Sequence, residues 1–160
     1  WLDDLWAQAT EVVPEGTALW VNNKSGVVQD LLVSGEVSLA DTNVVALPVG
    51  LTMIANPYPT DLKLGVKGTD VGVDPSYSQL AEGAYSDGTA ANSDKILFWD
   101  GSAYVGYWYC DGTGYGPDYD GQWLDDLWVK QDLLDIPVGS GIWYNRKAGA
   151  AGSWDKNKNF

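Results

Sequence analysis

Apolar and polar residues alternate in short runs along the chain, and turn-forming residues separate these runs. Alternation with a period of two is typical of half-buried β-strands. It predicts strands near residues 18–22, 27–33, 44–47, 51–55, 61–64, 95–99, 104–109 and 141–145. One short helix is expected at 75–81, where Pro75 suits a first helical turn. The pattern therefore predicts an all-β, antiparallel sandwich or barrel-like module.

The clearest local signal is a hairpin in the second half of the chain. Two aromatic-rich runs, 95–99 and 103–109, are joined by Asp100-Gly101-Ser102, and Asp-Gly between two such runs favours a tight turn. On the second strand Tyr104, Trp108 and Cys110 share one face, whereas Val105, Tyr107 and Tyr109 share the other. Large side chains on both faces indicate a strand packed between two surfaces.

The chain also repeats itself. The hexapeptide Trp1-Leu2-Asp3-Asp4-Leu5-Trp6 recurs unchanged as Trp123-Leu124-Asp125-Asp126-Leu127-Trp128. After one extra residue the match continues, since residues 14–22 resemble 137–145, and residues 48–56 give a weaker third copy. Each copy places Pro-x-Gly, which predicts a turn, before a strand-like run.

This internal sequence repeat predicts a first repeat unit over residues 1–122 and a partial second unit over 123–160, which matches 1–38. The two ends would then be structurally equivalent. The alternative is a duplication kept inside one compact domain. Trp1 is not an initiator residue, so we expect the chain to be processed or cut from a longer one. Residues 65–93 are rich in Gly, Asp, Ser and Ala and predict a long exposed loop.

Charge and composition exclude several classes of function. The net charge of -13 opposes binding to nucleic acid and to anionic lipid, and no apolar run approaches the length of a membrane span. Histidine is absent and Cys110 is the single cysteine, which removes the common nucleophilic triads. The adjacent acids Asp3 and Asp4 are candidates for the acid and base of a glycosidase. Neighbouring residues on a strand point to opposite faces, so this pair cannot flank one scissile bond. We therefore expect no enzymatic activity.

Aromatic residues with a polar group are in excess, with nine Trp and nine Tyr against two Phe. Such side chains suit sugar-binding platforms as well as core packing. Four of them are candidates for a glycan platform: Trp6, Trp128, Tyr107 and Trp108. Trp20 and Trp143 hold the same position in the repeat, so we expect both to be buried core anchors.

A glycine-rich loop over residues 111–121 carries the carboxylates of Asp111, Asp118 and Asp120. Oxygen ligands on a flexible turn suit Ca²⁺, although the spacing differs from that of an EF-hand. A solvated loop is the interpretation we favour, with calcium as its alternative. We expect no other cofactor.

These features together resemble a known kind of module. The Trp-Leu-Asp-Asp-Leu-Trp copies, the Pro-x-Gly strands, residues 55–59 and the hairpin at 96–101 are similar to uncharacterised Trp/Gly-rich β-modules that occur in tandem within large secreted bacterial surface proteins. The resemblance implies an extracellular or cell-surface location and brings no catalytic or cofactor residues to carry over. The equivalence of the two ends favours a structural protein that self-associates end to end through its terminal repeat segments, as a filament, surface layer or adhesin stalk. The alternative is a carbohydrate-binding module.

Overall fold

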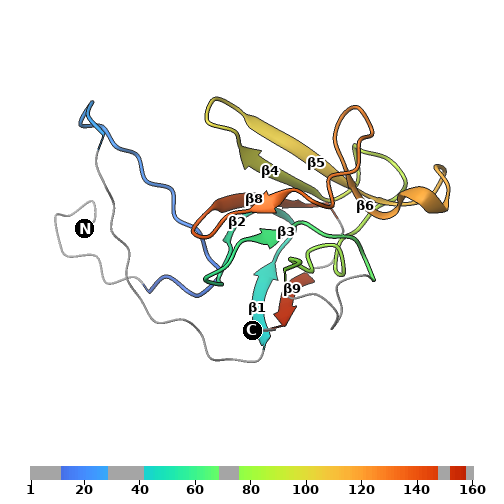
Figure 1. Cartoon of the computed structure of the whole chain (residues 1–160), viewed down its shortest axis with the longest axis horizontal. Coiled ribbons are helices and arrows are strands. Elements are labelled where there is room, and N and C mark those ends of the chain that lie inside the picture. Colours follow the sequence, from blue (N-terminus) through green and yellow to red (C-terminus); the bar gives the residue numbers. More distant parts are fainter. Residues whose placement is uncertain (1–11, 29–41, 69–75, 148–151, 158–160) are drawn as a thin grey trace.

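The part of the chain that the structure describes forms short antiparallel strands and almost no helix (Figure 1). The computed structural model describes residues 12–28, 42–68, 76–147 and 152–157. Within them the strands are β1 (Thr42–Leu47), β2 (Gly50–Ala55), β3 (Leu62–Lys63), β4 (Lys95–Trp99), β5 (Tyr104–Asp111), β6 (Asp120–Leu124), β7 (Asp135–Ile136), β8 (Gly141–Arg146) and β9 (Gly152–Asn157), with one 3₁₀ turn, η1 (Pro117–Tyr119). Every pairing between these strands is antiparallel, which confirms the all-β prediction.

Two distant segments, 42–63 and 135–157, run antiparallel to each other through three successive ladders. β1 pairs with β9, β2 with β8, and β3 with β7. The ladder is interrupted where prolines at 48, 57, 59 and 137 stand, since proline has no N–H to donate. Each interruption lets the paired chains change direction, and Figure 1 shows β1 and β9 running away from β2 and β8.

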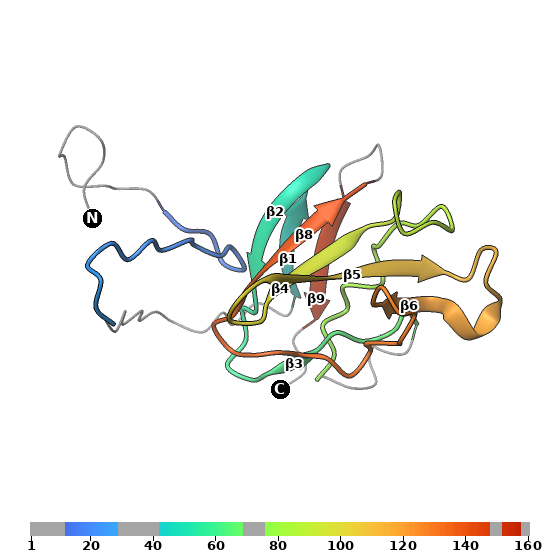
Figure 2. The ribbon, with the colours of Figure 1, turned by 90° about the horizontal axis from the view of Figure 1, so that it is seen from above.

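The largest sheet has five strands in the order β2-β8-β4-β5-β6. The predicted hairpin forms its centre, and β4 has the expected bounds. Asp100 closes the turn, because its Oδ1 accepts hydrogen bonds from the backbone N–H groups of Ser102 and Ala103 at 2.7 and 2.8 Å. Figure 2 shows these strands side by side, with β8 between β2 and β4.

One face of this sheet, which we call the inner face, forms the main core. Its buried side chains include Ile54, Ile96, Tyr109, Trp123, Ile142 and Tyr144. The opposite, outer face of β5 is covered over part of its length, where Trp108 and Cys110 pack with Leu124 in a second cluster. The expectation that this strand lies between two packed surfaces is confirmed.

The loop predicted to be exposed over residues 65–93 is instead partly built into the core. Ser78, Leu80, Ala81 and Ser93 are buried, and the indole N–H of Trp154 donates to the Ser78 carbonyl at 2.6 Å. Leu80 and Ala81 supply the apolar surface that the short strands lack. The helix predicted at 75–81 is wrong over 76–81, where turns and an isolated bridge occur; Pro75 lies outside the described residues.

The two sequence copies share a turn and then diverge. Thr17 N–H donates to the Pro14 carbonyl at 3.1 Å with Gly16 at φ 76°, and Ser140 N–H donates to the Pro137 carbonyl at 3.0 Å with Gly139 at φ 74°. The predicted Pro-x-Gly turn is therefore confirmed in both copies. The following residues form β8 in the second copy, but 18–22 lie in no strand, contrary to the prediction.

The proposed boundary between the repeat units, at residues 122 and 123, falls inside β6. The residues that follow it complete the sheets begun by residues 42–63. Much of the first copy, 1–11 and 29–38, lies outside the described residues. Structural equivalence of the two whole copies therefore stays a prediction.

Candidate functional site

Three aromatic side chains gather on the outer face of the five-stranded sheet. Strand register aligns Met53 with Trp143, Trp143 with Leu97, and Trp99 with Tyr104, and alternation puts these side chains on one face. Trp99 is 52% exposed and Tyr104 is 40% exposed. We call the set Met53, Leu97, Trp99, Tyr104 and Trp143 the aromatic face.

Contacts between the rings fix the geometry of the aromatic face. The rings of Trp99 and Tyr104 meet edge to face, with their centroids 5.1 Å apart at 61°. The indole N–H of Trp143 donates to the Tyr104 hydroxyl at 3.2 Å. A side chain at Gly106 would approach Leu97 Cδ2 within 3.2 Å, so the glycine keeps the surface low between the rings. Apolar ring faces next to a phenol hydroxyl suit a sugar or an apolar protein segment.

The glycan platform predicted from the sequence is not a single surface. Trp108 is 2% exposed and lies beneath the rings of Trp128 and Tyr115, at centroid distances of 5.1 and 6.0 Å. Tyr107 projects from the opposite face of β5, where its ring meets Phe98 at 5.8 Å and burial raises its pKa. Trp6 lies outside the described residues. Among the described members of the predicted set, Trp128 alone combines exposure with a defined aromatic contact.

Trp128 is held by a loop that the second hexapeptide copy forms after β6. Asp125 Oδ1 accepts hydrogen bonds from the N–H groups of Leu127 and Val129 at 2.8 and 2.9 Å. Trp128 adopts a φ of 67°, and its ring packs edge to face against Tyr115 at 4.4 Å. Because these rings are not coplanar, they cap the buried Trp108 rather than offering one flat stacking surface.

The two predicted core anchors do not anchor the core. Trp20 is 64% exposed, and Trp143 is half-buried on the outer face. Ile142 and Tyr144 face the core instead, and alternation then directs Trp143 outward. For Trp143 the prediction identified the correct strand but the wrong residue along it, whereas Trp20 lies in no strand.

The candidate calcium ligands are not gathered into a site. Asp111 and Asp120 face each other where the β5–β6 ladder shifts register. The Oδ1 of Asp111 accepts a hydrogen bond from the Thr113 N–H at 3.0 Å. Asp118 is exposed in η1. Within the parts of the chain that the structure describes, no group of three or more acidic, cysteine or histidine side chains is placed to hold a metal ion. Cys110 is buried, and burial raises the pKa of its thiol.

A buried ionic centre, which the sequence did not reveal, surrounds Asp94. Its Oδ2 accepts hydrogen bonds from the Tyr85 N–H at 3.0 Å and the Tyr144 hydroxyl at 2.8 Å, and its Oδ1 accepts the Lys147 N–H at 2.7 Å. Arg146 Nη1 lies 3.5 Å from Oδ2. Burial, and then the Asp94 carboxylate, raise the pKa of Tyr144. Nothing local around Asp94 marks it in the sequence, because its partners come from two other segments, Tyr85 and residues 144–147.

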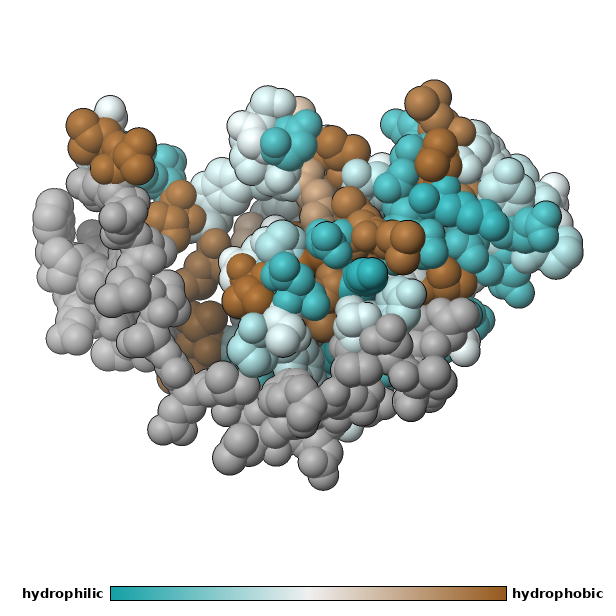
Figure 3. Space-filling model, in the orientation of Figure 1, coloured by the Kyte–Doolittle hydropathy of each residue, from teal (hydrophilic) through white to brown (hydrophobic). Residues whose placement is uncertain are grey.

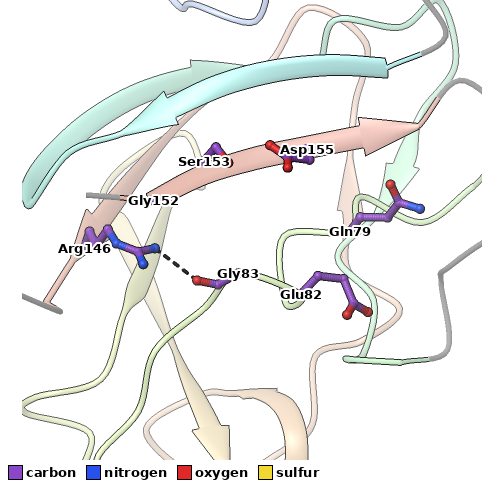
Figure 4. Close-up of a pocket in the computed structure, with 7 residues that line it drawn as sticks. All are labelled: Gln79, Glu82, Gly83, Arg146, Gly152, Ser153 and Asp155. Carbon is purple, nitrogen blue, oxygen red and sulfur yellow. Dashed lines mark hydrogen bonds between the residues drawn. The ribbon is translucent and has the colours of Figure 1, made fainter. Parts of the chain in front are cut away.

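A hollow of about 260 Å³ lies beside this centre (Figure 4). Arg146 points across it and donates from Nη1 to the Gly83 carbonyl at 3.0 Å. The lining residues come from the loop before β4 and from β8 and β9: Gln79, Glu82, Gly83, Arg146, Gly152, Ser153 and Asp155. Since the one basic group in this lining is bonded to Gly83 and Asp94, the hollow is a junction between elements rather than an anion site.

Residues 12–28, which we call the arm, leave the sheets (Figure 1). The arm touches β2 at one point, where Thr17 bridges Ile54 and the Ala55 N–H donates to the Gly16 carbonyl at 2.8 Å. Beyond it, Asn23 closes a turn by donating from Nδ2 to the Val27 carbonyl at 2.7 Å. Seven apolar residues of the arm are exposed: Val12, Val13, Leu19, Trp20, Val21, Val27 and Val28. Figure 3 shows apolar residues at its outer end, away from the sheets.

Comparison with family models, with curated proteins and with solved structures finds no match to this chain. Among the described residues, none of the helical segments has the length and apolar character needed to cross a membrane. The aromatic face and the arm are the two candidate functional surfaces of the described residues.

Proposed function

We propose that this chain is an extracellular or cell-surface structural module, a β-sandwich or barrel-like repeat unit whose copies associate end to end. The proposal rests on the exposed apolar residues of the arm. The arm repeats the sequence around β8, shares its Pro-x-Gly turn, and yet holds Leu19, Trp20 and Val21 outside the sheets. A strand-like segment with exposed apolar residues favours a protein partner.

Burial of the exposed apolar residues of the arm is comparable in free energy with the cost of association. Burying one large apolar side chain contributes about 1.5–3 kcal/mol, and seven such residues are exposed on the arm. Association costs an estimated 4–15 kcal/mol of translational and rotational freedom. A contact between an arm and a different surface of the next copy does not close on itself, so repetition yields a filament rather than a dimer.

The first prediction concerns solution size. We expect the mean mass of the chain to rise with protein concentration in sedimentation or light-scattering measurements at 0.15 M salt, where the net charge of -13 is screened. The double variant Leu19→Ser, Val21→Ser removes apolar area from the arm and should stay monomeric at concentrations where the wild type grows.

Leu133→Ser is the control, because Leu133 is exposed to nearly the same extent as Leu19 but lies on a loop distant in sequence from the arm. It should grow as the wild type does. A wild-type chain that keeps a constant monomer mass over two decades of concentration would contradict the proposed function.

A second function, binding of a carbohydrate, is favoured by the aromatic face. Trp99 and Tyr104 are exposed and held against each other, and the Tyr104 hydroxyl is placed to bond a sugar hydroxyl. The net charge disfavours acidic glycans and so favours neutral ones.

Affinity electrophoresis measures this binding as the retardation of the protein by neutral soluble polysaccharides, and we expect the wild type to be retarded. Trp99→Ala should weaken binding by about tenfold or more, because stacking against the indole ring buries apolar area worth at least about 1.4 kcal/mol. Trp20→Ala removes an exposed indole from the arm and should leave the retardation unchanged. Absence of retardation of the wild type by every neutral polysaccharide would rule this function out.

A further inference from the structure

β2 has two sides along which another strand can pair, and they are occupied differently. β2 is the end strand of the five-stranded sheet among the described residues, and β8 pairs along its whole length on one side. On the other side, the pairing found among the described residues is the single bridge from Ile54 to Thr17. A strand with one side open presents main-chain groups that another strand can bond.

The arm matches this open side in sequence and in direction. Residues 14–22 repeat 137–145, the segment that forms the turn before β8 and most of β8 itself. Both turns have the same hydrogen bond, and both following segments meet β2 in antiparallel orientation. Residues 17–22 and β2 contain no charged residue, so their pairing brings no like charges together in a chain of net charge -13.

Within its own molecule the arm turns away after this first bridge. Ala18 lies against Gly141 at the start of β8, where an added Cβ would come within 3.0 Å of the Ala18 Cβ. Residues 18–28 then lie in no strand, and Val28 is 97% exposed. An open strand and a matching segment that has left it are the conditions under which identical molecules exchange elements.

We propose that residues 18–22 of one copy add to the open side of β2 in a second copy, as a sixth strand of its main sheet. This rests on the proposed end-to-end association and names the interface. Continuing the register of Thr17 with Ile54 places Leu19 opposite Thr52 and Trp20 opposite Leu51.

The register assigns each arm residue to a face of the acceptor sheet. Leu19 shares the inner face with Ile54, whose side chain is fully buried in the core. Trp20 falls on the outer face beside Leu51, which is 58% exposed, and near Met53 of the aromatic face. Trp20 thereby lies on the same face of the sheet as Trp143, which holds the equivalent position in the second sequence repeat. The shared sequence of the two repeats favours this arrangement.

A pair of single-cysteine variants tests this interface. The hydrogen bond from the Ala55 N–H to the Gly16 carbonyl makes Gly16 and Ala55 a hydrogen-bonded pair, so the next pair, Thr17 and Ile54, is non-hydrogen-bonded. The two kinds of pair alternate along an antiparallel ladder, so positions 19 and 52 are also a non-hydrogen-bonded pair. Such pairs have Cα atoms about 4.5 Å apart, within the range for a disulfide. Leu19→Cys and Thr52→Cys are made separately in a Cys110→Ser background, mixed in equal amounts above the association concentration, and mildly oxidised.

We expect most chains to form the mixed disulfide between positions 19 and 52, identified by peptide mapping. The control mixture replaces Leu19→Cys with Val28→Cys, which is more exposed but lies outside the register, and should give at least fivefold less. If Cys110→Ser does not fold, the same variants retain Cys110, whose thiol is buried.

Two results would overturn the interface. The first is a mixture that forms no more of the 19–52 disulfide than the control. The second is a disulfide that forms within a single chain carrying both Leu19→Cys and Thr52→Cys but not in the mixture, since the arm then closes on its own sheet. Growth of the wild type without the mixed disulfide would leave the proposed function standing and place the contact elsewhere. A wild type that never grows would remove both proposals.

Discussion

Asp94→Ala is expected to lower the free energy of unfolding by about 3–5 kcal/mol, the loss typical of breaking a buried ion pair from one side. The carboxylate is fully buried, and it accepts hydrogen bonds from Tyr85, Tyr144 and Lys147 beside the guanidinium of Arg146. Its removal leaves a largely buried positive charge without its carboxylate and the Tyr144 hydroxyl without its acceptor. Urea denaturation followed by tryptophan fluorescence measures the loss.

Two further variants separate the contributions. Asp94→Asn keeps an acceptor for some of the N–H groups and removes the charge, so its loss should fall between those of the wild type and Asp94→Ala. Asp126→Ala removes an exposed carboxylate from the loop after β6 and should change stability by less than about 0.5 kcal/mol. A loss below about 1 kcal/mol for Asp94→Ala would show that the centre does not hold these segments together.

Trp123→Ala is expected to cost about 3–5 kcal/mol of stability, whereas the identical change at Trp20 should cost less than about 0.5 kcal/mol. Trp123 is fully buried, and its ring meets those of Tyr109 and Tyr144 at centroid distances of 5.4 and 6.3 Å. Truncation to alanine leaves a cavity between three strands. Trp20 extends from the arm with most of its surface in water.

The comparison is made by denaturation at a concentration where the chain is monomeric, because the Trp20 variant would otherwise also weaken association. Equal losses at the two positions would mean that the arm packs as part of the core in the isolated molecule. A small loss at Trp123 would contradict the inner face as the main core.

Local sequence determined the features that need only neighbouring residues. Asp100 and Gly101 specify the β4–β5 turn, since a carboxylate can bond the N–H groups two and three residues ahead and glycine accepts a positive φ. Proline and glycine fix the turns at 14–17 and 137–140 in the same way. Alternation along β5 likewise predicted which side chains share a face.

Tertiary structure alone decided which face is buried and what a repeated segment becomes. Trp143 and Tyr144 are both large and aromatic, and the position of the core beneath β8 sends one outward and the other inward. The same turn leads to a strand after Gly139 but to an exposed arm after Gly16, because β4 and β2 flank β8 on both sides whereas β2 meets the arm at one bridge. Asp94 gains its role from partners up to 53 residues away in sequence. Burial, pairing and charge balance depend on contacts between distant segments, and no local pattern of residues encodes them.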